Sequence, residues 1–323
     1  MSEYAATETM EYPPSELIID HGKIYHLDLR PEMVADKVIL VGDPDRVAIV
    51  ASYFDSIESQ TNHREFTSRT GTFQGKRITV LSTGIGVGNI DITLNELDAL
   101  VNIDFTHRKH KESTRSLEIV RIGTCGLLQA DIPIHSFVVS AYAVGLDNIA
   151  HFYDCNFSPE ELSINAAVMA HLELPAQIST YAIQATPSLV HRLRSQGETV
   201  SGITITSPGF YGPQGRQLRL KTHTSELNHR LGSFRYNLSV DDTADSTSAV
   251  SSTTSEGESN AIDLPLRILN FEMESSALFA LGRSLGHQCC SVCLAIANRP
   301  ALKFSDDYTP HMKRLIEFVL ARI

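Results

Sequence analysis

The chain has 323 residues, of which 42% are hydrophobic and 20% are charged, as in an ordinary globular protein. Its 27 basic and 38 acidic residues give a formal net charge of −11, which argues against nucleic-acid and membrane partners. No apolar run reaches the roughly 18 residues of a spanning helix, the acidic N-terminal residues lack the apolar core of a secretory signal, and five cysteines are too few for a disulfide framework. We therefore expect a reduced, cytoplasmic protein.

Apolar, β-branched runs alternate with helical patterns along the chain. Such runs predict strands at 38–41, 77–81, 119–123, 137–144, 200–206, 267–273 and 290–297. Apolar residues at helical spacing predict helices at 90–101, 159–172, 187–195, 275–285 and 312–323. The alternation predicts an α/β fold with a parallel or mixed sheet covered on both faces.

Three segments depart from this pattern. Residues 1–22 are expected to form a loose N-terminal arm, and residues 107–112 a charged loop. Residues 239–262 are rich in Ser, Thr, Asp and Glu, so burial cannot offset their ordering entropy and a flexible insertion is expected. Nothing resembles a linker between two cores, and 23–323 is therefore predicted to be a single domain.

Two short motifs favour structural explanations. Gly84-Ile85-Gly86-Val87-Gly88 lies between a predicted strand and a predicted helix, but its G-x-G-x-G spacing favours a tight turn over a dinucleotide site. Cys290-Ser291-Val292-Cys293 has the spacing of half a zinc site, but it lies in an apolar run without a second pair. Residues three apart in a strand point to opposite faces, so buried structural cysteines and no metal site are predicted.

Arginines accompany glycines at two predicted strand ends. Gly42 and Arg46 follow the first strand, and the motif with Arg121, Thr124 and Gly126 closes the third. Backbone amides in such turns, with arginine and a threonine hydroxyl, suit phosphate or another oxyanion. Because ligand crevices form at the carboxyl ends of strands, the two segments together favour an anion site over surface arginines.

Glu272-Met273-Glu274 ends another predicted strand, just before the helix expected from Ser275. The carboxylates could cap that helix. They could also accept hydrogen bonds from sugar hydroxyls, with the methionine lying against the ring. The residues alone leave both interpretations open.

These segments, in this order, resemble the nucleoside phosphorylase family of the hexameric type, and within it the members that cleave uridine. The resemblance covers residues 23–323 and rests on five motifs: Gly42-Asp43-Pro44-Asp45-Arg46, His63-Arg64-Glu65-Phe66, Ser82-Thr83-Gly84-Ile85-Gly86, Arg121-Ile122-Gly123-Thr124-Cys125-Gly126 and Phe271-Glu272-Met273-Glu274-Ser275. It implies a mixed, partly barrel-like sheet flanked by helices. It also implies a pentosyltransferase of pyrimidine salvage that converts uridine and phosphate reversibly to uracil and α-D-ribose 1-phosphate, with no cofactor.

The resemblance further implies a set of site residues. Phosphate would be held by Gly42, Arg46, Arg121 and Thr124, joined by Arg64 of a neighbouring subunit. Ribose would be held by Glu65, Thr124, Met273 and Glu274, joined by His26 of that neighbour. The base would meet Cys125, Gly126, Phe210, Gln214, Arg216 and Glu272. Catalysis would rest on Arg121, Gln214 and Arg216, with Arg299 as a further candidate near a closing flap.

The chemistry of uracil supports the assignment of Phe210-Tyr211-Gly212-Pro213-Gln214-Gly215-Arg216 as the loop that binds the base, here called the base loop. Uracil presents two carbonyls and an N–H along one edge, whereas Gln214 offers a carbonyl and an amide and Arg216 offers only donors. The pair can satisfy that edge and stabilise the anionic base as it leaves. Purine-cleaving relatives place an Asp after a Ser near Asn298-Arg299, and this sequence has no acid there.

Departures from the family pattern leave alternatives open. The Gly86-Val87-Gly88-Asn89 continuation puts an interface cation in doubt, and Cys125 stands where a hydroxyl residue is frequent. Insertions near 103–117 and 239–262 favour a homodimer with shared sites over a hexamer. The alternative functions are a phosphorylase for thymidine, deoxyuridine or purine nucleosides, a hydrolytic nucleosidase, and an inactive nucleoside-binding relative.

Overall fold

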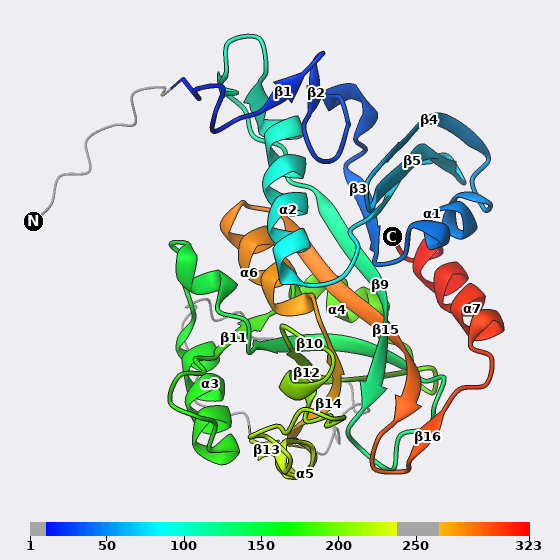
Figure 1. Cartoon of the computed structure of the whole chain (residues 1–323). Helices are drawn as coiled ribbons and strands as arrows, with labels where there is room; N and C mark the ends of the chain where they lie inside the picture. The colour runs from blue at the N-terminus through cyan, green and yellow to red at the C-terminus, as the bar shows by residue number, and fades with distance from the viewer. Residues whose placement is uncertain (1–10, 238–264) are drawn as a thin grey trace, which may run out of the picture.

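The computed structural model describes residues 11–237 and 265–323 (Figure 1). Its strands are β1 (Ile19–Asp20), β2 (Lys23–Ile24), β3 (Lys37–Val41), β4 (Ser56–His63), β5 (Phe66–Phe73), β6 (Lys76–Ser82), β7 (Ile103–Asp104), β8 (Lys109–His110), β9 (Glu118–Leu127), β10 (Phe137–Gly145), β11 (Tyr181–Gln184), β12 (Thr199–Thr206), β13 (Arg235–Tyr236), β14 (Leu266–Glu272), β15 (Gln288–Asn298) and β16 (Lys303–Phe304). Its α-helices are α1 (Pro44–Ala51), α2 (Val87–Asn102), α3 (Pro159–Leu172), α4 (Pro187–Leu193), α5 (Leu227–Ser233), α6 (Ser275–Ser284) and α7 (Thr309–Leu320).

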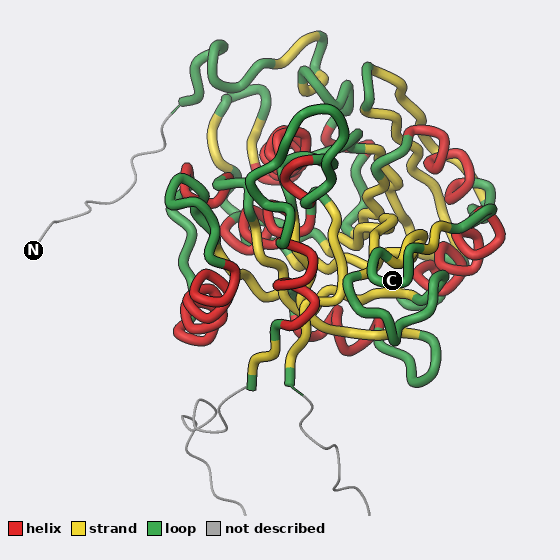
Figure 2. The backbone as a smooth tube through the Cα atoms, turned by 60° about the horizontal axis from the view of Figure 1, so that its bottom comes forward, coloured by secondary structure: helices red, strands yellow, loops and turns green. Residues whose placement is uncertain are grey.

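A 12-stranded mixed sheet organises the molecule. Its main path runs β13-β14-β12-β10-β15-β9-β3-β6-β5-β4, and β14 also pairs with β9, so five strands close on themselves. Figure 2 shows the strands gathered centrally with helices around them. The expected mixed, partly barrel-like sheet flanked by helices is therefore confirmed.

The parallel register of the central strands brings distant segments together. β3 pairs with β9 from Lys37↔Glu118 to Val41↔Ile122, so the turn that begins at Gly42 lies beside the outer half of β9, which begins at Gly123. β12 pairs in parallel with β14 up to Thr206↔Glu272. Because parallel strands end at a common edge, the loops after β3, β12 and β14 and the outer half of β9 can line one site.

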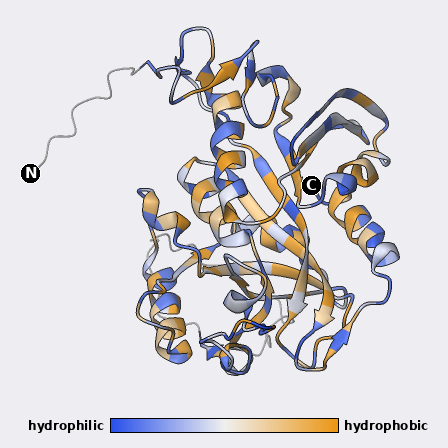
Figure 3. Cartoon of the chain, viewed as in Figure 1, coloured by the Kyte–Doolittle hydropathy of each residue, from blue (hydrophilic) through white to orange (hydrophobic). Residues whose placement is uncertain are grey.

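The core lies between the sheet and its helices. Hydrophobic residues, orange in Figure 3, fill much of the central strands, and Ile39 and Leu40 of β3 are completely buried. α2 packs against α6, which in turn covers β10 and β15, while α7 packs on β9 and β15. This packing fixes where the strand ends lie. No helix in the described part of the chain is both long and apolar enough to cross a membrane.

Each predicted strand and helix is present, with shifts of a few residues at the ends. The helix 159–172 matches α3 fully, and a Ser158 capping box explains its start. The last helix begins at Thr309 and ends at Leu320. The hairpin of β4 and β5 lacks a sequence signal because β4 is polar and mostly exposed.

The segments expected to be irregular differ from the prediction where the structure describes them. Residues 11–22 pack on the body: Leu17 is buried and Ile19 pairs with Ile24. The charged loop over 107–112 is instead partly ordered, because β8 pairs with β7 and the Tyr12 N–H donates to the Arg108 carbonyl over 2.8 Å. Residues 1–10 and the insertion over 239–262 lie outside the described residues.

The closely spaced cysteines of β15 are buried, as predicted. Cys290 packs within the main core, whereas Cys293 packs with Cys125 and Leu127 in a small separate cluster. The two thiols therefore lie on opposite faces of the strand, which is what the alternation of side chains requires.

Candidate active site

One cavity of about 800 Å³ gathers most of the predicted site residues. Its walls come from the turn after β3, the start of β5, the end of β9, the loop after β12 and the end of β14. Among its lining residues are Gly42, Arg46, Glu65, Arg121, Thr124, Cys125, Gly126, Phe210, Gln214, Arg216, Glu272, Met273 and Glu274. The sequence motifs thus converge on one space.

Arg121 lies at the centre of a buried charge cluster. Its Nη2 donates to Glu274 Oε2, and its Nη1 lies 3.5 Å from Glu272 Oε2. Although burial alone lowers the pKa of Arg121, the two carboxylates raise it above its ordinary value. Burial raises the pKa of Glu274, and the Arg121 guanidinium opposes that rise. The arginine is thereby held charged in one orientation beside the cavity.

Glu272 occupies a structural position rather than an open one. Its carboxylate accepts from the backbone N–H groups of Glu274 (2.9 Å) and Ser275 (3.0 and 3.1 Å) and from the Thr206 hydroxyl (2.6 Å). It therefore satisfies donors at the start of α6, as a capping carboxylate does. Glu272 also lines the cavity, and its expected contact with the base stays a prediction.

A second guanidinium, that of Arg46, faces the same end of the cavity. The Asp43 carboxylate caps α1 by accepting from Asp45 N–H over 3.0 Å, and Arg46 follows in the first turn with Nη1 3.3 Å from the Ile122 carbonyl. Burial lowers the pKa of Arg46, and the neighbouring charge of Arg121 adds to this effect. Two buried like charges at one end of a cavity form a site for an anion.

Glycines make room for this arrangement. A Cβ at Gly42 would lie 3.3 Å from the Gly84 carbonyl, so only a glycine lets the two turns approach freely. Gly84 has a φ of +69°, and a Cβ there would lie 2.7 Å from the Asn89 amide. The predicted tight turn at 84–88 is confirmed, and the Gly86 N–H donates to Glu274 Oε1 over 2.7 Å.

The opposite end of the cavity is formed by the loop after β12. Gln214 is 3% exposed, and its Nε2 donates to the Ser207 hydroxyl over 2.8 Å. Arg216 donates to Gln214 Oε1, and its guanidinium stacks 3.8 Å from the centre of the Phe210 ring. The pair therefore presents amide, carbonyl and guanidinium groups beside an aromatic ring.

Cys125 and Gly126 form the wall between these two ends. Burial raises the pKa of the Cys125 thiol well above its ordinary value, so the thiol is neutral. A Cβ at Gly126 would lie 3.9 Å from both Arg216 and Arg299. Both arginines therefore lie beside this part of β9, at a distance that a side chain larger than glycine would still allow.

Arg299 supports the loop from outside the cavity. Its Nη1 donates to the Gln214 backbone carbonyl, and its side chain faces a separate cavity next to Leu128 and Phe304. Burial and the neighbouring charge of Arg216 lower the pKa of Arg299 to about 10. In this geometry Arg299 supports Gln214, and its expected part in catalysis stays a prediction.

Arg64 and His26 lie together outside the cavity. Arg64 occupies the β4–β5 turn with its guanidinium 5.8 Å from the centre of the Tyr25 ring, and His63 Nδ1 contacts the His26 carbonyl over 2.9 Å. The His26 ring is held by Glu96, which lies 2.6 Å from Nδ1. The two residues expected to act from a neighbouring subunit therefore share one surface of this chain.

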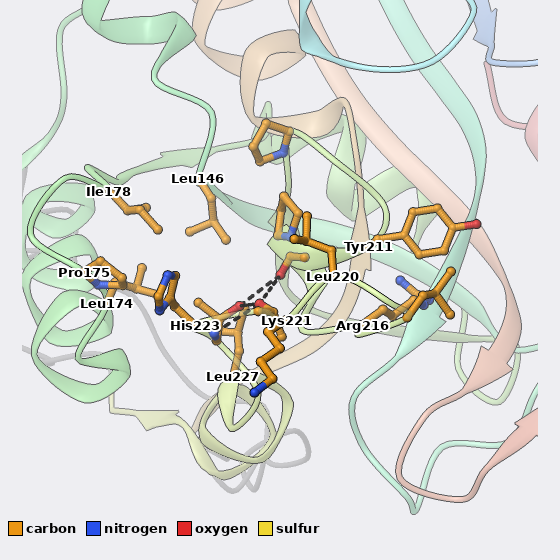
Figure 4. Close-up of a pocket in the computed structure, with 16 residues that line it drawn as sticks. Leu146, Leu174, Pro175, Ile178, Tyr211, Arg216, Leu220, Lys221, His223 and Leu227 are labelled. Carbon is orange, nitrogen blue, oxygen red and sulfur yellow. Dashed lines mark hydrogen bonds between the residues drawn. The ribbon is translucent and has the colours of Figure 1, made fainter.

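A second cavity, of about 650 Å³, lies behind the base loop (Figure 4). Leu146, Ile178 and Leu220 contribute apolar walls, and Arg216 borders both cavities. Its lining lacks the buried carboxylates and Arg46, so the predicted anion-binding motifs meet in the first cavity and not in this one.

The structure adds residues that sequence reasoning missed. Thr206 and Ser207 anchor Glu272 and Gln214, while Ile85 and Phe304 line the cavity. Only Thr206 and Ser207 have a signal in hindsight, since they end a predicted strand at the edge where ligands bind.

Comparison with known proteins places this geometry in a family. Residues 36–320 match the sequence model of the phosphorylase superfamily, and the chain belongs to that family. A uridine phosphorylase of Thermococcus kodakarensis is 29% identical over 285 residues, covering 88% of this chain and 81% of the relative. A uridine phosphorylase of Escherichia coli is 28% identical over 85% of this chain and 86% of the relative.

Solved structures agree with this assignment. A Trypanosoma brucei nucleoside phosphorylase, described as showing uridine phosphorylase activity, superimposes with a TM-score of 0.79 at 29% identity, over 94% of this chain and 98% of that chain. A uridine phosphorylase of Vibrio fischeri, 19% identical with a TM-score of 0.60 over 93% of each chain, shares the fold. The expected nucleoside phosphorylase family is confirmed.

Proposed function

We propose that the chain is a uridine phosphorylase, which converts uridine and phosphate reversibly to uracil and α-D-ribose 1-phosphate. One observation carries the proposal: a single cavity joins the Arg46–Arg121 end to the Gln214–Arg216 end. Met273 and Glu274 lie in its wall, within the segment expected to hold ribose. The likeness to uridine phosphorylases over most of the chain supports it.

The arginine end supplies what the nucleophile needs. In phosphorolysis, phosphate attacks the anomeric carbon as the glycosidic bond breaks, so the protein must position a dianion rather than supply a base. Arg46 and Arg121 provide charged donors, and Glu274 holds Arg121 in place while a second carboxylate oxygen accepts from the Gly86 N–H. Phosphate held here also stabilises the positive charge that develops on the sugar.

The loop end supplies what the leaving group needs. Negative charge spreads over the uracil carbonyls as the bond breaks, and the Arg216 guanidinium can take it up. Phe210 stacks on that guanidinium and lines the same cavity. Gln214 offers one amide hydrogen and one carbonyl lone pair beyond those it uses inside the protein.

We expect Arg216→Ala to lower kcat/KM for uridine by about 10- to 100-fold, because it removes a charged donor to the base. The loss should fall on KM for the nucleoside, through weaker recognition of the base, and on kcat, through lost stabilisation of the leaving group. KM for phosphate should change little. Arg219→Ala is the matched control, since Arg219 is exposed on the same loop. Equal rises in both KM values would contradict the assignment of Arg216 to the base.

The active unit in this proposal is a homodimer of pyrimidine salvage in the cytoplasm, with sites shared between subunits. Arg64 and His26 share a surface outside their own cavity, as residues that serve a partner must. A two-fold interface would place that surface against the partner's cavity.

Mixing two inactive variants tests the shared site. Arg64→Ala removes the side chain that would complete the partner's site. Arg121→Ala removes a side chain of the chain's own site. After dissociation and reassociation, a mixed dimer regains one intact site, so we expect about a quarter of wild-type activity from random pairing. A mixture as inactive as each variant alone would place Arg64 in the site of its own chain.

Uracil release from uridine, followed by absorbance with and without phosphate, tests the proposed activity. Release that depends on phosphate is the expected result. Release without phosphate would indicate a nucleosidase, and cleavage of inosine in place of uridine would indicate a purine enzyme. No cleavage of any nucleoside would indicate a binding protein.

A further inference from the structure

The amide of Gln214 is fixed at both ends by the protein. Its Oε1 accepts from Arg216, and a guanidinium can only donate, so this atom must be the carbonyl oxygen. Its Nε2 donates to Ser207 Oγ over 2.8 Å. The amide therefore has a defined orientation before any base arrives.

Ser207 is built to accept that hydrogen bond. It is completely buried, directly after β12, and its N–H donates to the Glu272 carbonyl over 3.0 Å. Its hydroxyl lies 3.2 Å from the Gly209 carbonyl and 3.4 Å from the Glu272 carbonyl, both of which can only accept. The hydroxyl proton is thus directed to the backbone, and the oxygen lone pairs are left for Gln214.

We propose that Ser207 is a specificity-determining positioning residue, which locks the Gln214 amide in the orientation that accepts uracil and opposes cytosine. The inference rests on the proposed function, since it concerns the base-binding end of that cavity. Ser207 acts through Gln214, and no contact with the substrate is required of it.

The orientation matters because uracil and cytosine differ at two neighbouring positions. Uracil carries an N3–H donor beside the O4 acceptor, whereas cytosine carries an N3 acceptor beside the N4 amino donor. An amide with fixed Oε1 and Nε2 can pair with the first arrangement, and a flipped amide would pair with the second. Fixing the amide therefore discriminates between the two bases, as polar sites built for one pattern do.

Ser207 is needed even though Arg216 also orients the amide. The same guanidinium must turn to a base carbonyl if it is to take up charge on the leaving group. When Arg216 moves to the base, its hold on Gln214 Oε1 weakens, and the hydrogen bond to Ser207 remains to prevent the flip. The hydrogen bond from Gln214 to Ser207 thus keeps the amide orientation while the base binds.

Binding of uridine and cytidine to Ser207→Ala, with sulfate in place of phosphate so that no turnover occurs, tests this inference. We expect the ratio of the two Kd values to shift by about fivefold toward cytidine, the effect of one neutral hydrogen bond. Ser207→Thr retains the hydroxyl and should restore the ratio. Ser140→Ala is the control, because Ser140 is an equally buried serine bonded to Thr204 over 2.6 Å in the neighbouring strand.

The outcomes separate the inference from the proposed function. A wild type that prefers uridine, with Ser207→Ala keeping the same ratio, overturns the role of Ser207 and leaves the function standing. A wild type that binds both nucleosides equally overturns both. If Ser140→Ala shifts the Kd ratio as much as Ser207→Ala does, loss of any buried serine hydroxyl alters the site. This result also overturns the role of Ser207.

Discussion

Replacing Arg121 with alanine should reduce phosphorolysis of uridine about a thousandfold, the upper range for removal of one preorganised donor to transition-state charge. The loss exceeds a single contact because Glu274 depends on the same guanidinium. Arg121→Lys should recover only a small part, since lysine keeps the charge but not the planar fork. Initial rates at saturating phosphate measure the effect, and Arg314→Ala, which breaks an exposed pair with Glu198, is the control.

The same substitution should make stability depend on pH. Without Arg121, two buried carboxylates lose their counter-charge, which costs about 3–5 kcal/mol of unfolding free energy. The pKa of Glu274 is already raised by burial, and removing Arg121 removes the opposing effect. A carboxyl whose folded pKa exceeds its unfolded pKa stabilises at low pH and destabilises as pH rises. Arg121→Ala should therefore melt closer to the wild type in mildly acidic buffer, and a constant gap across pH would contradict this.

Glu272→Ala should also cause a large loss of stability, because the carboxylate caps α6 and faces Arg121. The carboxylate accepts from two backbone N–H groups at the start of α6 and from Thr206. Leaving these buried donors unpaired should lower the unfolding free energy by about 2–4 kcal/mol. Activity should fall with it, because Glu274 and Arg121 lose a common support. Denaturant unfolding measures the change.

Two further variants serve as an intermediate case and a control for Glu272→Ala. Glu272→Gln keeps one acceptor oxygen and the side-chain volume, so it should lie between Ala and the wild type. Glu317→Ala removes an exposed acceptor from Tyr53 and should change stability little. If Glu272→Ala unfolds at the same denaturant concentration as the wild type, the capping role is wrong.

The strands that position the site could be predicted because they are buried on both faces and rich in β-branched residues. β3 and β12 each contain a run of buried β-branched residues, which only a covered sheet accommodates. β4 could not be predicted, since its residues are polar and its partner β5 supplies the order. Nor does any periodicity reveal that β14 also meets β9, because that pairing depends on how far the sheet twists.

Parts of the site could be predicted where one motif combines a charged residue with a glycine at the end of a strand. Gly42 and Arg121 belong to such motifs, and both line the cavity. Roles that depend on which atom faces which partner could not be predicted. Glu272 accepts a hydrogen bond at the start of α6, and Arg299 donates to the backbone carbonyl of Gln214. Sequence spacing gives the neighbourhood of a side chain, and only packing gives its direction.

The position of β9 also has a kinetic consequence. Its first residue, Glu118, pairs with Lys37 of β3 and with Gln288 of β15, so the strand that carries Arg121 is completed only by segments far away along the chain. Contacts of such long sequence separation form slowly, because loop closure must precede them. During synthesis, the Arg46–Arg121 end of the cavity cannot be complete until β15 has left the ribosome and paired with β9. The enzyme should therefore fold in a late, concerted step, and substrate affinity and the native sheet should appear together.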